Sequence, residues 1–264
     1  MKILFIGDIY GKLGRETIKK ILPKIKKEHK PDLIIANAEN SAHGSGITET
    51  TQSELKESGI HFITMGDHAF DRPEQANVCF ADSQPIIRPA NLPDQLPGHG
   101  HKIFKTKLGD VLIINLLGRV NMPFQYDCPF KKFDEIYKSY DHEKIATTIV
   151  DFHGETTAEK ICFGHYVDGR AHIVVGTHTH VPTADARLLP KKTAYITDIG
   201  MTGAYNESIG IDLSLAIKTL IDQVKYKRTI PDSGEVILSG ALINFDTTRK
   251  KAKSITQIQY FDKI

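Results

Sequence analysis

The sequence predicts an α/β protein in which helices cover a largely parallel β-sheet. Along the first third of the chain, short apolar runs alternate with segments of helical periodicity, which is the rhythm of βαβ units. These apolar runs end in glycine or polar residues, and functional residues gather at the carboxyl ends of strands in such sheets. The chain has 264 residues, 40% of them hydrophobic, without a repeat or obvious linker, so we expect one domain over residues 1–264.

The first part of the chain contains three predicted strands and two predicted helices. Residues 2–6 are continuously apolar, as expected for a strand buried on both faces. The helix after this strand has apolar residues at helical spacing, and we expect a kink near Pro23. Thr48 is a suitable N-cap for a second helix that Gly59 ends. The other two strands are predicted at 33–36 and 62–65.

The rest of the chain is less regular. Pro, Asn and Gly in residues 85–97 predict a loop, and Gly109 marks the turn of a hairpin. Thr156 and Glu159 have the spacing of a capping box, which predicts the start of a helix. The remaining predictions are strands at 103–104, 111–117, 145–152, 171–176, 194–197, 236–245 and 255–260, helices at 134–140 and 213–224, and a loop at 122–130.

Charge, hydropathy and cysteine content exclude several classes of partner. The net charge is +2 and the basic residues are scattered, which argues against binding of duplex nucleic acid. No apolar run approaches the roughly 18–20 residues of a membrane span, and no signal peptide is recognisable. Cys79, Cys128 and Cys162 form no Cys-x-x-Cys pair, so we expect reduced thiols and a cytoplasmic protein. The number of subunits stays open, with a homo-oligomer as one alternative.

Two histidines follow the predicted strand at 171–176. His178 and His180 are two positions apart, and an extended backbone would send both side chains into one pocket at the end of the strand. Neutral imidazole is a common metal ligand near pH 7. Because a surface loop explains an isolated His-x-His equally well, the metal interpretation depends on the other strand ends.

Side chains suited to metal binding also follow the other strands. Mixed carboxylate, amide and imidazole donors suit Fe, Mn or Zn, whereas Mg disfavours imidazole and structural zinc favours thiolates. Seven ligands are too many for one ion, but two ions about 3.5–4 Å apart that share a carboxylate would use them all. The candidate ligands are Asp8, Glu39, Asn40, Asp67, His153, His178 and His180, and His68 stands beside Asp67.

These residues lie in segments that resemble a known family. The ordered motifs of the calcineurin-like metallophosphoesterases resemble Gly7-Asp8, Asn37-Ala38-Glu39-Asn40, Gly66-Asp67-His68, His153 and Gly176-Thr177-His178-Thr179-His180. The stretch from Gly7 to Arg15 matches Gly-Asp-x-x-Gly-x-x-Gly-Arg of one bacterial branch, the YmdB-like 2′,3′-cyclic-nucleotide phosphodiesterases. The resemblance runs in order from Met1 to beyond Gly203.

The resemblance implies a four-layer α/β/β/α sandwich of the metallo-dependent phosphatase type, with a dinuclear site at one edge of the sheets. It implies two divalent or trivalent metal ions, with iron preferred and manganese or zinc as alternatives. The implied reaction is hydrolysis of 2′,3′-cyclic nucleotides to 3′-nucleotides by attack of a metal-bridging hydroxide. In that pattern Asp8, Asn40 and His180 hold one ion, Asp67, His153 and His178 hold the other, Glu39 bridges them, and His68 is the catalytic proton donor.

Asp67 is a departure from this pattern, because the family has asparagine there. An additional negative charge should tighten metal binding, lower the Lewis acidity of the ions, and raise the pKa of His68 through a hydrogen bond. Asp71, which the family also has, is retained.

Other functions are compatible with these motifs. One is a phosphatase or nucleotidase of other specificity. Another is a catalytically weakened regulatory metal-binding protein linked to RNA metabolism. Gly7, Gly11 and Gly14 do not have the spacing of a dinucleotide fingerprint, and Asp8 lies among them, so we disfavour that alternative.

Overall fold

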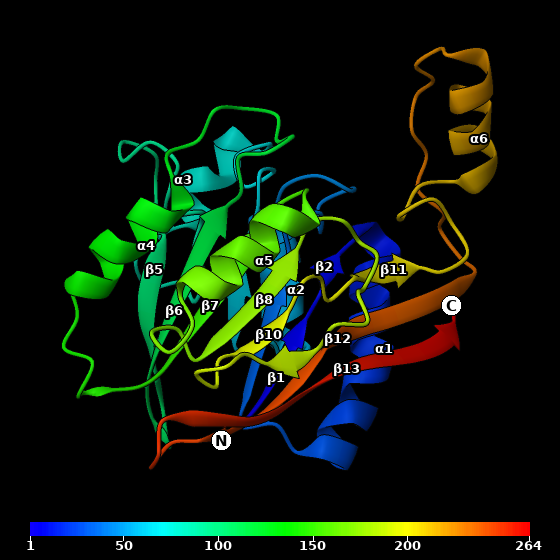
Figure 1. The fold of residues 1–264 in the computed structure, drawn as a ribbon. Helices are drawn as coiled ribbons and strands as arrows, with labels where there is room; N and C mark the ends of the chain where they lie inside the picture. Colours follow the sequence, from blue (N-terminus) through cyan, green and yellow to red (C-terminus); the bar gives the residue numbers. More distant parts are fainter.

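Two β-sheets pack against each other in the computed structural model, which describes residues 1–264 (Figure 1). The first sheet consists of β1 (Lys2–Ile6), β2 (Asp8–Ile9), β3 (Leu33–Asn37), β4 (Phe62–Thr64), β11 (Met201–Ala204), β12 (Glu235–Asp246) and β13 (Lys251–Lys263). The strand order is β2-β11-β12-β1-β3-β4, and β13 pairs with β12. Because β1, β3 and β4 run parallel, their carboxyl ends lie at the same edge.

The second sheet has six strands. They are β5 (His101–Thr106), β6 (Gly109–Leu117), β7 (Ile145–His153), β8 (Ile173–Thr177), β9 (Arg187–Leu188) and β10 (Ala194–Ile196). The order is β5-β6-β7-β8-β10-β9, with β6, β7, β8 and β10 parallel and an antiparallel strand at each edge. The carboxyl ends of β7 and β8 therefore lie side by side.

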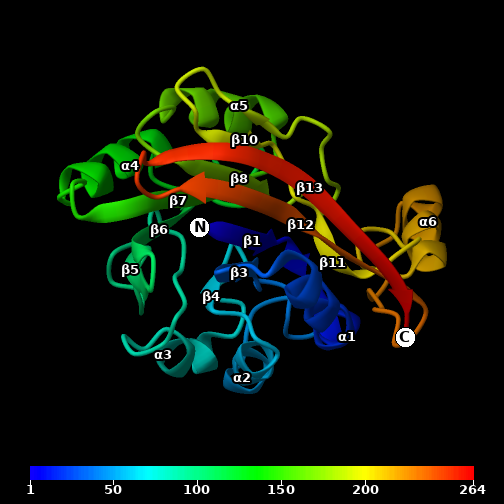
Figure 2. The same ribbon diagram turned by 90° about the horizontal axis from the view of Figure 1, so that it is seen from below.

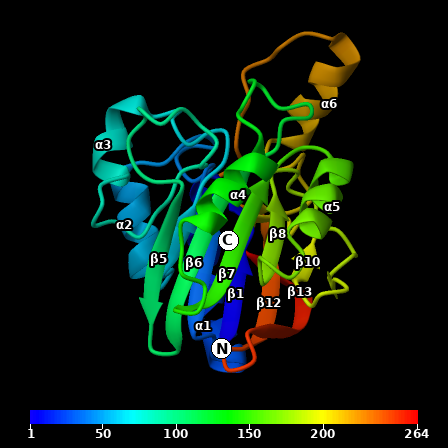
Figure 3. The same ribbon diagram turned by 60° about the vertical axis from the view of Figure 1, so that its left-hand side comes forward.

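All helices except the last cover the outer faces of the two sheets (Figures 2 and 3). The helices are α1 (Gly11–His29), α2 (Glu49–Glu57), α3 (Ala76–Cys79), α4 (Pro129–Lys138), α5 (Thr157–Tyr166) and α6 (Leu213–Asp222), with a 3₁₀ turn η1 (Pro73–Gln75). Residues of α1 and α2 share a buried cluster with β1 and β3, whereas α4 and α5 share one with β6 and β7. The predicted four-layer α/β/β/α sandwich is therefore confirmed.

The side chains of β1 show why its sequence is continuously apolar. Ile3 and Phe5 belong to the cluster between the two sheets, together with residues of β6, β7 and β8. Leu4 and Ile6 point to the opposite face and pack under α1. Alternate residues of a strand face opposite sides, so a strand covered on both faces has no polar position.

Most predicted elements form near their predicted positions, but the capping box is wrong. Thr156 is the N-cap of α5, yet its side chain makes no capping hydrogen bond. The Glu159 carboxylate instead accepts the backbone N–H groups of Arg119 (2.9 Å) and Val120 (3.0 Å). The loop after β6 brings these donors close to Glu159. The spacing of residues along the chain cannot predict such partners, because they come from a distant segment.

Other boundaries also differ from the predictions. The helix predicted at 134–140 begins at Pro129, whose fixed φ suits the first turn, so the predicted loop at 122–130 ends earlier. The helix α1 continues through Pro23, and α6 ends at Asp222 instead of residue 224. The short strands β2, β9 and β11 were not predicted. None of the helices combines the length and apolar character that crossing a bilayer requires.

Candidate metal centre

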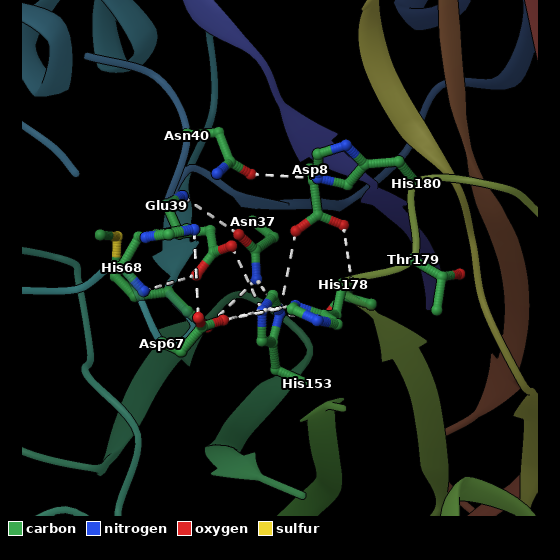
Figure 4. A network of polar contacts seen from close by, with 12 residues as sticks. Asp8, Asn37, Glu39, Asn40, Asp67, His68, His153, His178, Thr179 and His180 are labelled. Atoms are coloured by element: carbon green, nitrogen blue, oxygen red, sulfur yellow. Dashed lines mark hydrogen bonds and ion pairs between the residues drawn. The ribbon is translucent and has the colours of Figure 1, made fainter. Parts of the chain in front are cut away.

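The predicted ligands lie together at one edge of the two sheets (Figure 4). Asp8 begins β2, Glu39 and Asn40 follow β3, and Asp67 and His68 follow β4, all in the first sheet. His153 is the last residue of β7, and His178 and His180 follow β8 in the second sheet. The site is thus assembled where the carboxyl ends of parallel strands from both sheets meet.

Four side chains form its tightest part. The donor atoms of Glu39, Asp67, His153 and His178 all lie within 4.8 Å of one another. His153 Nε2 is 3.2 Å from a Glu39 oxygen and 3.1 Å from Asp67 Oδ1. His178 Nδ1 is 3.3 Å from the same Asp67 oxygen. Two carboxylates and two imidazoles that converge in this way match the donor set of a transition-metal site.

Asp8, Asn40 and His180 form the second part. His180 Nε2 lies 3.2 Å from Asn40 Oδ1, and Asp8 accepts the backbone N–H of His178 at 3.2 Å. Asp8 is fully buried, and its Oδ1 has no hydrogen-bond partner. Burial raises the pKa of this carboxyl above its ordinary value. An orphaned carboxylate oxygen is costly in a protein interior, and a cation beside it would remove that cost. The residues therefore fit a metal centre.

The Thr177 hydroxyl orients His153. Thr177 donates its only hydroxyl proton to Asp151 Oδ1 (2.6 Å), so it accepts from His153 Nδ1, 2.8 Å away. That tautomer leaves the Nε2 lone pair of His153 facing Glu39 and Asp67. Asp151 is buried, and burial raises its pKa to about 6. Asn37 and Thr64 complete the set of donors to this carboxylate.

The predicted extended backbone at the two histidines is wrong. β8 ends at Thr177, and His178 (φ 100°) and His180 (φ 64°) both have positive φ values. Both histidines still face the site, because a turn rather than a strand presents them, and they point toward different partners. His178 Nε2 lies 3.1 Å from Glu155, and His180 Nδ1 donates to the carbonyl of Ile209 at 3.0 Å.

A buried ion pair holds this turn. Lys160 Nζ and Asp198 Oδ2 are 2.7 Å apart, and each side chain is only 1% exposed. Lys160 also donates to the Thr177 carbonyl (2.7 Å), and Asp198 accepts from the Thr179 hydroxyl (2.8 Å). The pair thus contacts the residues directly before His178 and between His178 and His180.

His68 lies beside the cluster at its open side. Its side chain is 38% exposed, and Nδ1 is 2.7 Å from Asp71, which Ser45 also contacts. Burial alone would lower the pKa of His68, but the nearby carboxylates of Glu39 and Asp67 raise this pKa above its ordinary value. Asp67 makes no hydrogen bond with His68, because the nearest approach is 4.0 Å at Nε2, so the predicted hydrogen bond is wrong.

Asp67 instead contacts two other members of the four-residue cluster. Its Oδ1 faces the rings of both His153 and His178, and these two neighbours hold the pKa of Asp67 well below its ordinary range despite its burial. The carboxylate is therefore negatively charged in the site. An anion at this position is what the predicted tighter metal binding and lower Lewis acidity of the ions require.

A cavity of about 350 Å³ opens onto the cluster. Several of the residues around the site were not predicted as functional. The turn residue Thr177 and Glu155 lie one and two positions from predicted ligands, so proximity in the sequence was the only available signal. Nothing in the sequence identified Tyr10, Ile209, Ile211 and Arg228 as lining residues of the cavity.

Known proteins resemble this chain over nearly its whole length. The family model described as "YmdB-like protein" matches residues 4–258. A 2′,3′-cyclic-nucleotide 2′-phosphodiesterase of Bacillus subtilis (strain 168) is 44% identical over 259 residues, which cover 98% of this chain and 96% of the relative.

Two solved structures share the fold. The crystal structure of a novel phosphatase from Mycoplasma pneumoniae superposes with a TM-score of 0.92 and 35% identity, covering 100% of this chain and 94% of the other. A protein of Thermus thermophilus, described as hypothetical, gives a TM-score of 0.91 and 32% identity, covering 99% and 100% of the two chains. The similarity thus includes both sheets and every segment of the site.

Proposed function

Because the chain belongs to the family of YmdB-like proteins, we propose that it hydrolyses 2′,3′-cyclic nucleotides to 3′-nucleotides in a metal-dependent reaction. The observation that carries the proposal is the convergence of Glu39, Asp67, His153 and His178 next to a further histidine, His68. Phosphodiester hydrolysis needs positive charge at the phosphate and a proton for the leaving alkoxide. The site offers residues for both tasks.

The seven predicted ligands would hold two metal ions. We assign Glu39 as the shared ligand, since one of its oxygens lies 3.2 Å from His153 of one group and its chain neighbour is Asn40 of the other group. When bound, such ions supply a nucleophile at neutral pH and neutralise the charge of the phosphate. We assign Asp8, Asn40 and His180 to one ion and Asp67, His153 and His178 to the other, with iron preferred over manganese or zinc.

His68 would act as the general acid. Its Nδ1 faces Asp71 at 2.7 Å, which directs the ring so that Nε2 remains for the substrate. As the bond between phosphorus and the 2′-oxygen breaks, the Nε2 proton passes to that oxygen. The oxygen of water bonds to phosphorus opposite the leaving 2′-oxygen and releases one proton to the solvent, and the phosphate stays on the 3′-oxygen. Asp71 is a positioning residue in this scheme.

The cellular setting completes the proposal. The family model spans almost the whole chain, which supports a single domain over residues 1–264. All three cysteines are free thiols, and Cys162 is exposed, which supports a reducing cytoplasm. The substrate is a small phosphodiester, and the charge distribution gives no support for duplex nucleic acid as a partner.

Product analysis tests the reaction. Protein supplemented with Fe²⁺ or Mn²⁺ is incubated with 2′,3′-cyclic AMP, 2′-AMP and 3′-AMP, and the products are separated by chromatography. We expect 3′-AMP from the cyclic diester and little hydrolysis of either monoester. Hydrolysis of monoesters alone would indicate a phosphatase. Loss of all turnover in metal-loaded protein would favour the regulatory alternative, in which Asp67 has weakened catalysis.

A further inference from the structure

Helix α6 stands away from both sheets (Figures 1 and 3). None of its ten residues is buried, although its sequence is largely apolar. Leu220 is 79% exposed and Ile221 is 76% exposed. Helices of globular proteins normally bury their apolar side, so the exposed side chains of α6 suggest a binding role.

A second cavity lies between α6 and the segment that follows it. It measures about 520 Å³, within the range of about 300–1,000 Å³ that small-molecule sites occupy. Six of its ten lining residues are hydrophobic, and they include Leu215 and Leu220 from α6. The aromatic Tyr226 and the hydroxyls of Ser208 and Thr219 complete a surface that offers both apolar contact and hydrogen bonds.

This second cavity adjoins the cavity of the metal centre. Ile209, Ile211 and Arg228 line both. The charged residues that line the second cavity, Lys225 and Arg228, are both basic, so the boundary between the two cavities favours an anionic ligand. A ligand whose phosphate lies at the metal centre can therefore extend past Arg228 toward α6.

The position of α6 relative to the metal centre is fixed by three contacts. The Ile209 carbonyl accepts the Nδ1 proton of His180, and the Asp212 N–H donates to the Thr229 carbonyl at 3.0 Å. Ile230 packs over the glycines of the site, since a Cβ on Gly44 would lie 2.8 Å from its methyl group. The walls of the second cavity are thereby held against a metal-centre histidine.

We propose that the cavity under α6 binds the nucleoside part of the substrate, with Leu220 as a specificity-determining residue. The inference rests on the proposed phosphodiesterase function and names how that site would distinguish a nucleotide from other cyclic diesters. A base has apolar faces and polar edges, which match the apolar wall and the hydroxyl groups. The positive charge of Arg228 lies between the cavities, next to the ribose phosphate.

Adjacent residues of α6 provide a matched test. Leu220 lines the cavity, whereas Ile221 does not, and the two are almost equally exposed, so neither substitution removes core packing. The variants Leu220→Ser and Ile221→Ser are assayed with Mn²⁺ on 2′,3′-cyclic AMP and on glycerol 1,2-cyclic phosphate, which has the same five-membered ring and no base. Their masses in solution are measured by sedimentation.

We expect Leu220→Ser to raise KM for 2′,3′-cyclic AMP about tenfold, as loss of one apolar contact does, with kcat and the glycerol substrate unaffected. Ile221→Ser should behave like the wild-type protein on both substrates. Equal effects of the two variants, or no effect of Leu220→Ser, would overturn the proposal. So would a change of mass with unchanged KM, which would make α6 an interface between copies. Failure of wild-type protein to hydrolyse either diester would instead refute the proposed function.

Discussion

The orientation of His153 depends on the single proton of a neighbouring hydroxyl. Thr177 gives that proton to Asp151 and must accept from His153 Nδ1, so Nε2 is left to bind a cation. Such outer partners commonly change metal affinity by about 10–100-fold when they are removed. The ligand and its support lie on neighbouring parallel strands, β7 and β8.

Thr177→Val should therefore weaken metal binding about 10–100-fold, because valine keeps the shape of threonine and removes the acceptor. The measurement is calorimetric titration of metal-free protein with Mn²⁺. Thr177→Ser keeps the hydroxyl and should bind as the wild-type protein does. Equal affinity of the valine variant and the wild-type protein would show that the hydroxyl does not orient His153.

Asp67→Asn should raise the phosphodiesterase rate. At roughly 4 Å and an effective dielectric constant near 20, a unit charge contributes about 4 kcal/mol before compensation. If one or two kcal/mol of this remain after the site relaxes, the rate changes about fivefold to thirtyfold. The same variant should bind one metal ion more weakly, since Asp67 Oδ1 faces both His153 and His178.

Steady-state rates at saturating metal test this expectation. Asp71→Asn serves as a comparison, because it changes a carboxylate that contacts His68 and lies outside the four-residue cluster. An unchanged or lower rate of Asp67→Asn at full metal occupancy would mean that the site is tuned around an aspartate.

All eight proposed site residues could be singled out from the sequence, because each lies at the end of a predicted strand and has chemistry that binds metals or protons. The residues that hold these side chains in place could not be identified from the sequence. Lys160 and Asp198 lie 38 positions apart and form a buried ion pair. No local spacing distinguishes this lysine from one on a solvated helix face, and only the packing of α5 against β8 and β10 makes the difference.

Two histidines accept a backbone hydrogen bond from a neighbouring strand. His61 precedes β4 and accepts the backbone N–H of Ile34 at 3.1 Å, and His172 precedes β8 and accepts that of Thr148 at 2.8 Å. Each acceptor must be a neutral ring nitrogen. Burial lowers the pKa of both rings, that of His172 to about 4.

Stability should depend on pH through His172. Its folded pKa lies below the unfolded value of 6.5, so between about pH 4 and pH 6.5 the unfolded chain binds more protons. The contribution is complete above pH 6.5 and is lost as the pH falls toward 4. Integration over this range gives a loss of about 2 kcal/mol in the free energy of unfolding between pH 7 and pH 5.

Urea denaturation at pH 7 and pH 5 measures this loss. His172→Asn keeps an acceptor for Thr148 and removes the titrating group, so its free energy of unfolding should fall by about 2 kcal/mol less than that of the wild-type protein. His99→Asn makes the same substitution at an exposed histidine and serves as the control for the change of side chain. Identical pH dependence of His172→Asn and the wild-type protein would refute this role.

Elements with a strong periodic pattern were predictable, and those that depend on distant partners were not. The strand β1 and the helix α2 formed where apolar runs and the Thr48 cap placed them. The turn at His178 and His180 has positive φ values, which the apolar sequence of β8 does not predict. The strand β11 forms because β2 and β12 lie on either side of it.

In the molecule as a whole, the candidate metal centre joins the two sheets. The first sheet supplies the carboxylates of Asp8, Glu39 and Asp67, and the second supplies the imidazoles of His153 and His178. The rhythm of strands and helices predicted the parallel sheets, and the four layers followed from the family resemblance. The exposed position of α6 was not predictable, because its apolar residues have the same spacing as those of a helix that packs on a sheet.

In the proposed reaction, His68 moves a proton while His178 holds a metal ion. The direct test measures metal content and turnover of 2′,3′-cyclic AMP in His68→Ala and His178→Ala, purified side by side without chelator. We predict that His68→Ala keeps about two ions per chain and loses ~10²–10⁴-fold in rate, whereas His178→Ala loses both metal and rate. These roles of His68 and His178 would be contradicted if His68→Ala lost its metal as completely as His178→Ala, or if His68→Ala kept the wild-type rate.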